Sequence, residues 1–143
     1  MRREDEIRRA MEIRKLVALQ AGSEDFYSKA KAKGEAAHTA LKNRGKSQIR
    51  NLENIANNAD KVSDLLDYVK KQTARSRPNQ DWRCHNFGQE LVQYIETGLQ
   101  QTTGRLETGL NPPPDEYEHQ QIRLLLLREF IRQMGTHFLY KGV

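Results

Sequence analysis

Apolar residues recur at helical spacing along most of the chain. The first segment ends near Ala21-Gly22, and its apolar positions are Ile7, Ala10, Met11, Ile13, Leu16 and Val17. Two later segments keep the same period, with Ile49, Leu52, Ile55 and Ala56 in one and Val62, Leu65, Leu66 and Val69 in the other. No run alternates with the period of two that a strand requires. We therefore predict an all-α fold: a compact bundle of five or six helices, with residues 1–143 forming a single α-helical domain.

Polar residues mark where several of these helices begin. Ser23, Ser47 and Asp60 each precede an apolar run and are predicted N-caps. Asp115 is followed three positions later by Glu118, which is the spacing of a capping box. These signals divide the chain into its helices.

The second half of the chain contains the most apolar helix. Phe87, Leu91, Tyr94 or Ile95, and Leu99 predict a fifth helix after a polar loop at residues 76–81. Residues 104–114 contain two glycines and three consecutive prolines, so we expect a Gly/Pro connector there. The final helix has one broad apolar face, formed by Leu126, Leu127, Phe130, Ile131, Met134 and Phe138. It should supply much of the core.

The first 44 residues are more charged than the rest. The segment from Ser23 is rich in Ala and Lys, with Phe26, Tyr27, Ala30, Ala37 and Leu41 as its weak apolar positions. These residues favour a helix, but they include few large apolar side chains that would drive its packing against other helices. We expect residues 1–44 to form charged helices at the periphery of the bundle.

Composition limits the cellular compartments in which we expect the protein. No stretch approaches the roughly 18–20 apolar residues of a membrane span, and the N-terminus has acids where a secretory signal needs an apolar core. The single cysteine, Cys84, rules out an internal disulfide and a multi-cysteine zinc site. We expect a protein of the reducing cytoplasm that does not bind membranes.

Positive charge is concentrated in one stretch. The net charge of the chain is +5, and residues 29–50 contain seven basic side chains against the single acid Glu35. Such an excess is typical of a surface that binds a polyanion, although a solvated helix face has the same appearance. Phosphate contact without base stacking suits a chain with so few aromatic residues, and implies little sequence specificity. The residues predicted to contact phosphates are Lys42, Arg44, Lys46 and Arg50, which should form one patch, extended by Lys70, Lys71 and Arg75.

Candidate catalytic groups are few. The four histidines, His38, His85, His119 and His137, are scattered without the spacing of metal ligands, so we predict no metal site and no cofactor. Cys84 lies close to Trp82 in the sequence, and a packing role suits it better than nucleophilic catalysis.

One spacing allows an enzymatic alternative. Arg132 and His137 form an Arg-x-x-x-x-His sequence, which resembles the motif of the HEPN superfamily of small α-helical domains. That resemblance implies a ribonuclease in which arginine and histidine side chains from two protomers converge on an RNA phosphate. Gln133 follows the arginine, where the superfamily favours Asn, Asp or His. A half-buried structural histidine is the other interpretation of His137, which falls near Leu126 and Phe130 on a continued helix.

Two segments resemble a different family, the small subunit of type III-A (Csm-type) CRISPR effector complexes. Residues 46–52, Lys-Ser-Gln-Ile-Arg-Asn-Leu, are similar to the Thr-Ser-Lys/Gln-Ile-Arg-x-Ile/Leu stretch that opens a central helix in that family. Residues 136–142, Thr-His-Phe-Leu-Tyr-Lys-Gly, are similar to its closing His-x-aromatic-Tyr-Gly-Gly pattern. Lys46 replaces the family's threonine, and Lys141 interrupts the closing pattern.

This resemblance implies a non-catalytic role in antiviral defence. Such subunits stack along the inside of a ribonucleoprotein filament and hold the guide–target duplex with basic side chains, while other subunits cleave RNA. The implied partners are guide RNA, target RNA, other CRISPR effector subunits and copies of the chain itself, with no small-molecule substrate. A third possibility, from the residues alone, is a helical module whose basic stretch binds an acidic protein.

Overall fold

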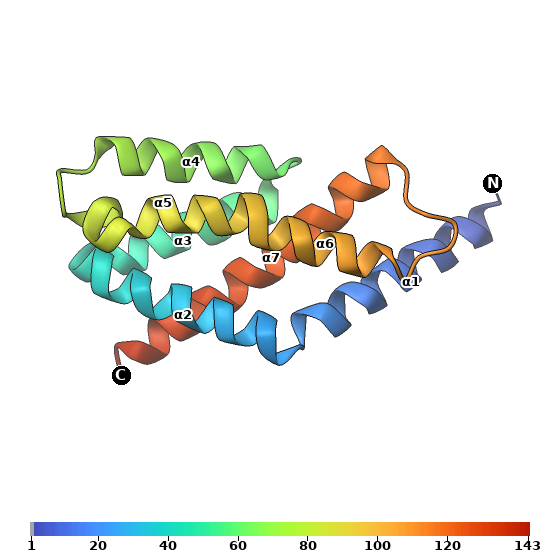
Figure 1. The fold of residues 1–143 in the computed structure, drawn as a ribbon, viewed down its shortest axis with the longest axis horizontal. Coiled ribbons are helices and arrows are strands. Elements are labelled where there is room, and N and C mark those ends of the chain that lie inside the picture. Colours follow the sequence, from blue (N-terminus) through green and yellow to red (C-terminus); the bar gives the residue numbers. More distant parts are fainter. Residues whose placement is uncertain (1) are drawn as a thin grey trace.

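The longest helix, α7 (Glu116–Lys141), is the element around which the other helices pack (Figure 1). The computed structural model describes residues 2–143, and in it α7 contacts α1, α2, α3, α4 and α6. The apolar face predicted from the sequence is buried in full: Leu126, Leu127, Phe130, Ile131, Met134 and Phe138. The prediction for the last helix is confirmed.

The remaining elements follow one another in a simple order. Helices α1 (Arg3–Ala21), α2 (Glu24–Leu41), α3 (Gly45–Asn58) and α4 (Val62–Arg75) come first, with a short 3₁₀ turn, η1 (Lys42–Arg44), between α2 and α3. A second 3₁₀ segment, η2 (Asp81–Asn86), leads into one unbroken helical run. That run comprises α5 (Phe87–Gln93), the π-helical η3 (Tyr94–Gly98) and α6 (Leu99–Glu107). Residues 2–143 contain no strand, so the all-α bundle is confirmed.

Helix α2 packs one face closely against α7, in contrast to the weak packing expected for this segment. Its alanines Ala30, Ala37 and Ala40 are buried, and a Cβ at Gly34 would lie only 2.5 Å from the Met134 carbonyl oxygen of α7. Small side chains let the two helix axes approach closely. The Ala-rich composition therefore reflects close packing here rather than weak packing.

Helix α1 is divided between a buried and an exposed half. Ile13, Val17 and Ala21 face the core, whereas the predicted apolar positions Ile7, Ala10 and Met11 remain exposed. The exposed half is held by Arg9, whose Nε donates to Glu118 Oε2 of α7 at 2.9 Å.

The predicted helix ends are confirmed in part. Ser23 Oγ accepts from the Phe26 amide at 3.2 Å, and Asp115 with Glu118 forms the predicted capping box. Ser47 lies inside α3 and Asp60 lies one residue before the Lys61 N-cap, so neither caps a helix.

Helix α6 continues to Glu107, so the connector begins at Thr108 and not at Gly104. Its Leu110 is buried and attaches the connector to the core.

Candidate nucleic-acid interface

The seven basic residues predicted to bind RNA are all exposed, but they lie on three different surfaces. One group lies at the end of the bundle where η1, the end of α4 and η2 meet (Figure 1). A second lies on the flank of α3 that faces the end of α7. The third is a single residue, Lys70, in the groove between α4 and α5. The single patch expected for Lys42, Arg44, Lys46 and Arg50 is therefore divided.

Arg44 and Arg75 both line one small hollow. It has a volume of about 80 Å³, and its lining also includes Gln48, Gln72, Ser76 and the acid Asp81. The two arginines are 31 positions apart in the sequence. The fold thus joins two basic segments that the sequence places one helix apart.

Lys71 extends this surface along α4. It lines a neighbouring hollow together with Arg75 and Tyr68, and the carboxylates of Asp64 and Asp67 lie in the same hollow. The positive surface is therefore limited toward the start of α4 by two acids.

Two further arginines at the same end were not among the predicted site residues. Arg77 lies in the loop after α4, and Arg83 lies in η2, where Nη1 donates to the Ser76 carbonyl at 3.4 Å. Both side chains are exposed. The run of Lys70, Lys71, Arg75, Arg77 and Arg83 was the sequence signal for them. Arg83 also lines the groove that contains Lys70, so it lies between the two surfaces. We call the surface at this end the basic end of the bundle; it comprises Lys42, Arg44, Lys71, Arg75, Arg77 and Arg83.

Lys46 and Arg50 point to the other side of α3. They line a hollow of about 470 Å³ with Glu53 and with Phe138 and Leu139 of α7. Gln48 and Asn51 lie on the opposite flank, where both form hydrogen bonds with the hydroxyl of Tyr68. Lys46 and Arg50 therefore form a separate flank pair.

A packed scaffold positions the basic end. The Tyr68 hydroxyl donates to Gln48 Oε1 at 2.8 Å and so connects α4 to α3. The Trp82 ring is buried, with Tyr68 against it edge-on at 6.2 Å between ring centroids and Phe87 at 5.4 Å. Because Trp82 fixes η2 to the core, the backbone that carries Arg83 is held in place.

Few carboxylates compensate the charge of the basic end. Arg44 is 3.9 Å from Asp81, and both side chains are substantially exposed. Such a solvent-exposed pair is weak, so a phosphate can compete for the guanidinium. Among residues 2–143, Lys42, Lys71, Arg75 and Arg77 have no ion-pair partner within 4.0 Å. By contrast, Lys70 lies 3.6 Å from Glu96.

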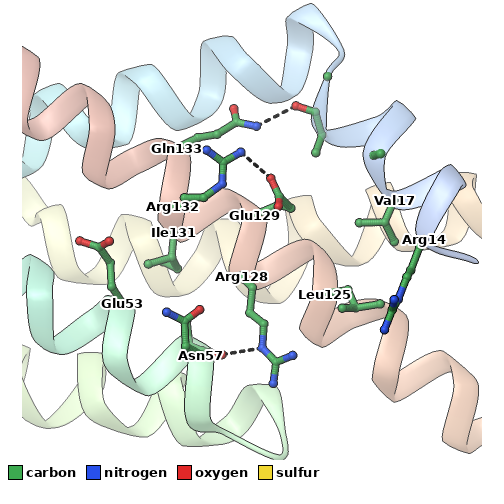
Figure 2. Close-up of a pocket in the computed structure, with 14 residues that line it drawn as sticks. Arg14, Val17, Glu53, Asn57, Leu125, Arg128, Glu129, Ile131, Arg132 and Gln133 are labelled. Atoms are coloured by element: carbon green, nitrogen blue, oxygen red, sulfur yellow. Dashed lines mark hydrogen bonds and ion pairs between the residues drawn. The ribbon is translucent and has the colours of Figure 1, made fainter.

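The candidate ribonuclease pair points to two different flanks of α7. Five positions on an α-helix separate two side chains by about 140°. Arg132 faces α1 and α3 and donates to Glu129 at 2.7 Å (Figure 2). His137 is half-buried, and its ring packs edge-on against Tyr27 of α2 with centroids 4.8 Å apart. Within one chain, the two side chains do not form a common site.

The other candidate chemistry has no assembled site in the part of the chain that the structure describes. Cys84 is partly buried and packs against the core. Residues 2–143 contain no cluster of three His, Cys, Asp or Glu side chains able to hold a metal ion. No helix within these residues is long and apolar enough to cross a membrane.

Comparisons with protein-family models, with curated proteins and with solved structures found no match to this chain.

Proposed function

We propose that the protein is a non-catalytic RNA-binding subunit that contacts the phosphate backbone of duplex RNA through the basic end of the bundle. The observation that carries the proposal is the meeting of Arg44 and Arg75 at one hollow, with Lys71 in the neighbouring hollow that Arg75 also lines. Arg and Lys side chains displace counterions from phosphates, and the resulting affinity is largely independent of base sequence. Double-helical RNA is bound mainly through its backbone and shape.

The assembly in which we propose that it acts is a type III CRISPR ribonucleoprotein in the cytoplasm, where it would stack in the effector filament beside the crRNA–target duplex. The support is the resemblance of residues 46–52 and 136–142 to the family's small subunit. These two segments are neighbours in space, because Ile49 and Arg50 share a hollow with Phe138 and Leu139. The flank pair lies on the same surface as both segments.

Binding of a labelled RNA duplex, followed by fluorescence anisotropy, tests the RNA-binding part. We expect Arg44→Gln together with Arg75→Gln to weaken binding by about 10- to 100-fold, equally for duplexes of unrelated sequence. The matched control is Lys61→Gln at the opposite end of α4, which should leave affinity unchanged. A Lys46→Gln/Arg50→Gln variant measures the flank pair, for which we expect the smaller loss. Unchanged affinity in the Arg44/Arg75 variant would contradict the proposal.

A nuclease assay tests the absence of catalysis. Purified protein should leave labelled single-stranded RNA intact. Cleavage that disappears in a His137→Ala variant would contradict the subunit role and favour the HEPN-type ribonuclease. Arg132→Ala would then be expected to abolish cleavage as well.

Recovery of bound RNA from cells tests the proposed assembly. The tagged chain, expressed in its native host, should co-purify with guide RNAs that contain a repeat-derived segment and with other effector subunits. RNA of no repeat origin, with no effector subunits, would contradict the CRISPR assignment but leave RNA binding itself standing.

A further inference from the structure

The exposed half of α1 presents apolar side chains to solvent. Ile7 is 52% exposed and Met11 is 65% exposed. At 100° per residue, Ile7, Met11, Arg14 and Ala18 lie within about 60° of one another around the helix. We call these four residues the α1 stripe. Arg9, on another face, holds this half of α1 to Glu118, so the stripe is presented on a fixed helix.

The α1 stripe leads into an open groove on the body of the bundle. The groove has a volume of about 770 Å³ and lies between α1, α3 and α7 (Figure 2). Its apolar and small lining residues are Val17, Ala18, Ala21, Ala56, Leu125 and Ile131. Arg14 and Ala18 belong to both the stripe and the groove, so the two form one continuous surface.

We propose that this surface binds a second copy of the chain, with the two α1 helices antiparallel across a two-fold axis. Along the stripe, the large side chains Ile7 and Met11 come first, and the small Ala18 follows beside the groove. An antiparallel copy places Ile7 of each chain against Ala18 of the other. Large side chains of one copy then fill the groove of its partner, and the fit is repeated by symmetry.

The charges along this surface agree with the same arrangement. Glu4 lies one turn before Ile7, on the same side of α1. At the other end of the groove, the Arg132 side chain is 62% exposed and close to the end of α1, where its neighbour Gln133 donates to the Ala21 carbonyl at 2.8 Å. Antiparallel pairing brings Glu4 of one copy toward Arg132 of the other. A parallel copy would bring the acidic first turns together.

Sedimentation velocity of the full chain over a range of concentrations tests the proposal. The wild-type chain should convert reversibly from monomer to dimer as its concentration rises. Met11→Lys should raise the dimer dissociation constant at least tenfold, because the same register places residue 11 against Arg14 of the other copy, which repels a lysine. Leu19→Lys is the matched control, because Leu19 is 63% exposed on the same helix but lies about 80° around it from Met11. That variant should dimerise like the wild type, and circular dichroism should show equal helicity in all three.

Disulfide trapping tests the orientation of the two helices. In a Cys84→Ser background, chains with Ile7→Cys and chains with Ala18→Cys should form a mixed disulfide on mild oxidation, since a bridge requires Cα atoms about 5.5 Å apart. Ile7→Cys chains alone should cross-link poorly, whereas parallel helices would join them readily.

A chain that stays monomeric at every soluble concentration would overturn the proposal, and so would a dimer that Met11→Lys leaves intact. A stripe that binds only a different protein would also overturn it. RNA binding uses the basic end, so the Met11→Lys monomer should retain its RNA contacts, and failure of either proposal leaves the other standing.

Discussion

The ring of Phe138 occupies the space that a side chain at Gly45 would need. A Cβ built on Gly45 would overlap Cζ and Cε2 of that ring. Gly45 begins α3 and Phe138 lies near the end of α7, and both are buried. The absence of a side chain at position 45 therefore lets α3 begin against the last turns of α7. This contact fixes the start of the helix that carries Lys46 and Arg50.

Gly45→Ala should destabilise the protein by about 1–3 kcal/mol, because Phe138 has to move within a packed core. Urea unfolding at neutral pH measures the change. Gly104→Ala is the matched control: Gly104 lies in α6 and nothing lies within 4 Å of its built Cβ. Replacing a helical glycine where there is room should stabilise by about 0.5–1 kcal/mol. Equal effects of the two substitutions would contradict the packing described for Phe138.

Phe130→Ala should cost about 3–5 kcal/mol, the range for removing a buried aromatic side chain. The ring is fully buried and packs against Phe26 and Tyr94, with centroids 5.9 and 4.7 Å away. Chemical denaturation of the variant and the wild type measures the difference in their free energies of unfolding. A loss below about 1 kcal/mol would mean that this face of α7 is not the centre of the core.

The amphipathic period of α3 and α4 was sufficient to predict their buried faces, because each has one apolar stripe. In α7 the predicted face is buried, but so are Ile122 and Leu124, because this helix is covered by others over more than half of its circumference.

At α2 the period was right, because Phe26, Ala30, Ala37 and Leu41 are buried, but the expected weak packing was wrong, because small residues such as Gly34 let the helix approach α7 closely. The period failed at α1, where a second apolar stripe, Ile7 and Met11, stays in solvent. Apolar spacing alone does not tell which of two stripes faces the core.

The sequence singled out seven basic residues, but it did not single out Arg77 and Arg83, and it did not predict how the basic residues are grouped. Lys46 and Arg50 are close to Arg44 in the chain, yet α3 turns them to its other flank. Arg75 is far from Arg44 in sequence, and only the packing of η2 and α4 beside the end of α2 brings the two together. Spacing along one helix predicts which face a side chain occupies, and the arrangement of several helices is needed to say which faces meet.

Because of the pair formed by Arg9 and Glu118, the free energy of unfolding should depend on pH in the acidic range. The hydrogen bond from Arg9 holds the pKa of the Glu118 carboxyl below its usual value, against the opposing effect of desolvation. The same hydrogen bond raises the pKa of Arg9, with Glu12 and Asp115 also nearby. Because the pKa of this carboxyl is lower in the folded chain, its charge stabilises the fold at pH values above the pKa of the unfolded chain, which is about 4.3. This contribution is lost as the pH falls through the folded pKa.

Glu118→Gln should therefore cost about 1–3 kcal/mol at pH 7, since it leaves a mostly buried guanidinium with a weaker partner. Urea unfolding at pH 7 and again near pH 3 measures the free energy of unfolding of both proteins. The difference between wild type and variant should be smaller in acid, where the wild-type carboxyl becomes protonated. A difference that stays constant over this pH range would show that charge on Glu118 contributes nothing to stability.

The salt dependence of RNA binding tests the central claim most directly. Each phosphate contact contributes about 0.7–0.9 to the slope of log affinity against log salt. Removing two cationic contacts with Arg44→Gln and Arg75→Gln should flatten the slope for an RNA duplex by about 1.4–1.8, while Lys61→Gln leaves it at the wild-type value. A double variant with the wild-type slope and affinity across the whole titration would contradict the assignment of the basic end as the RNA-binding surface.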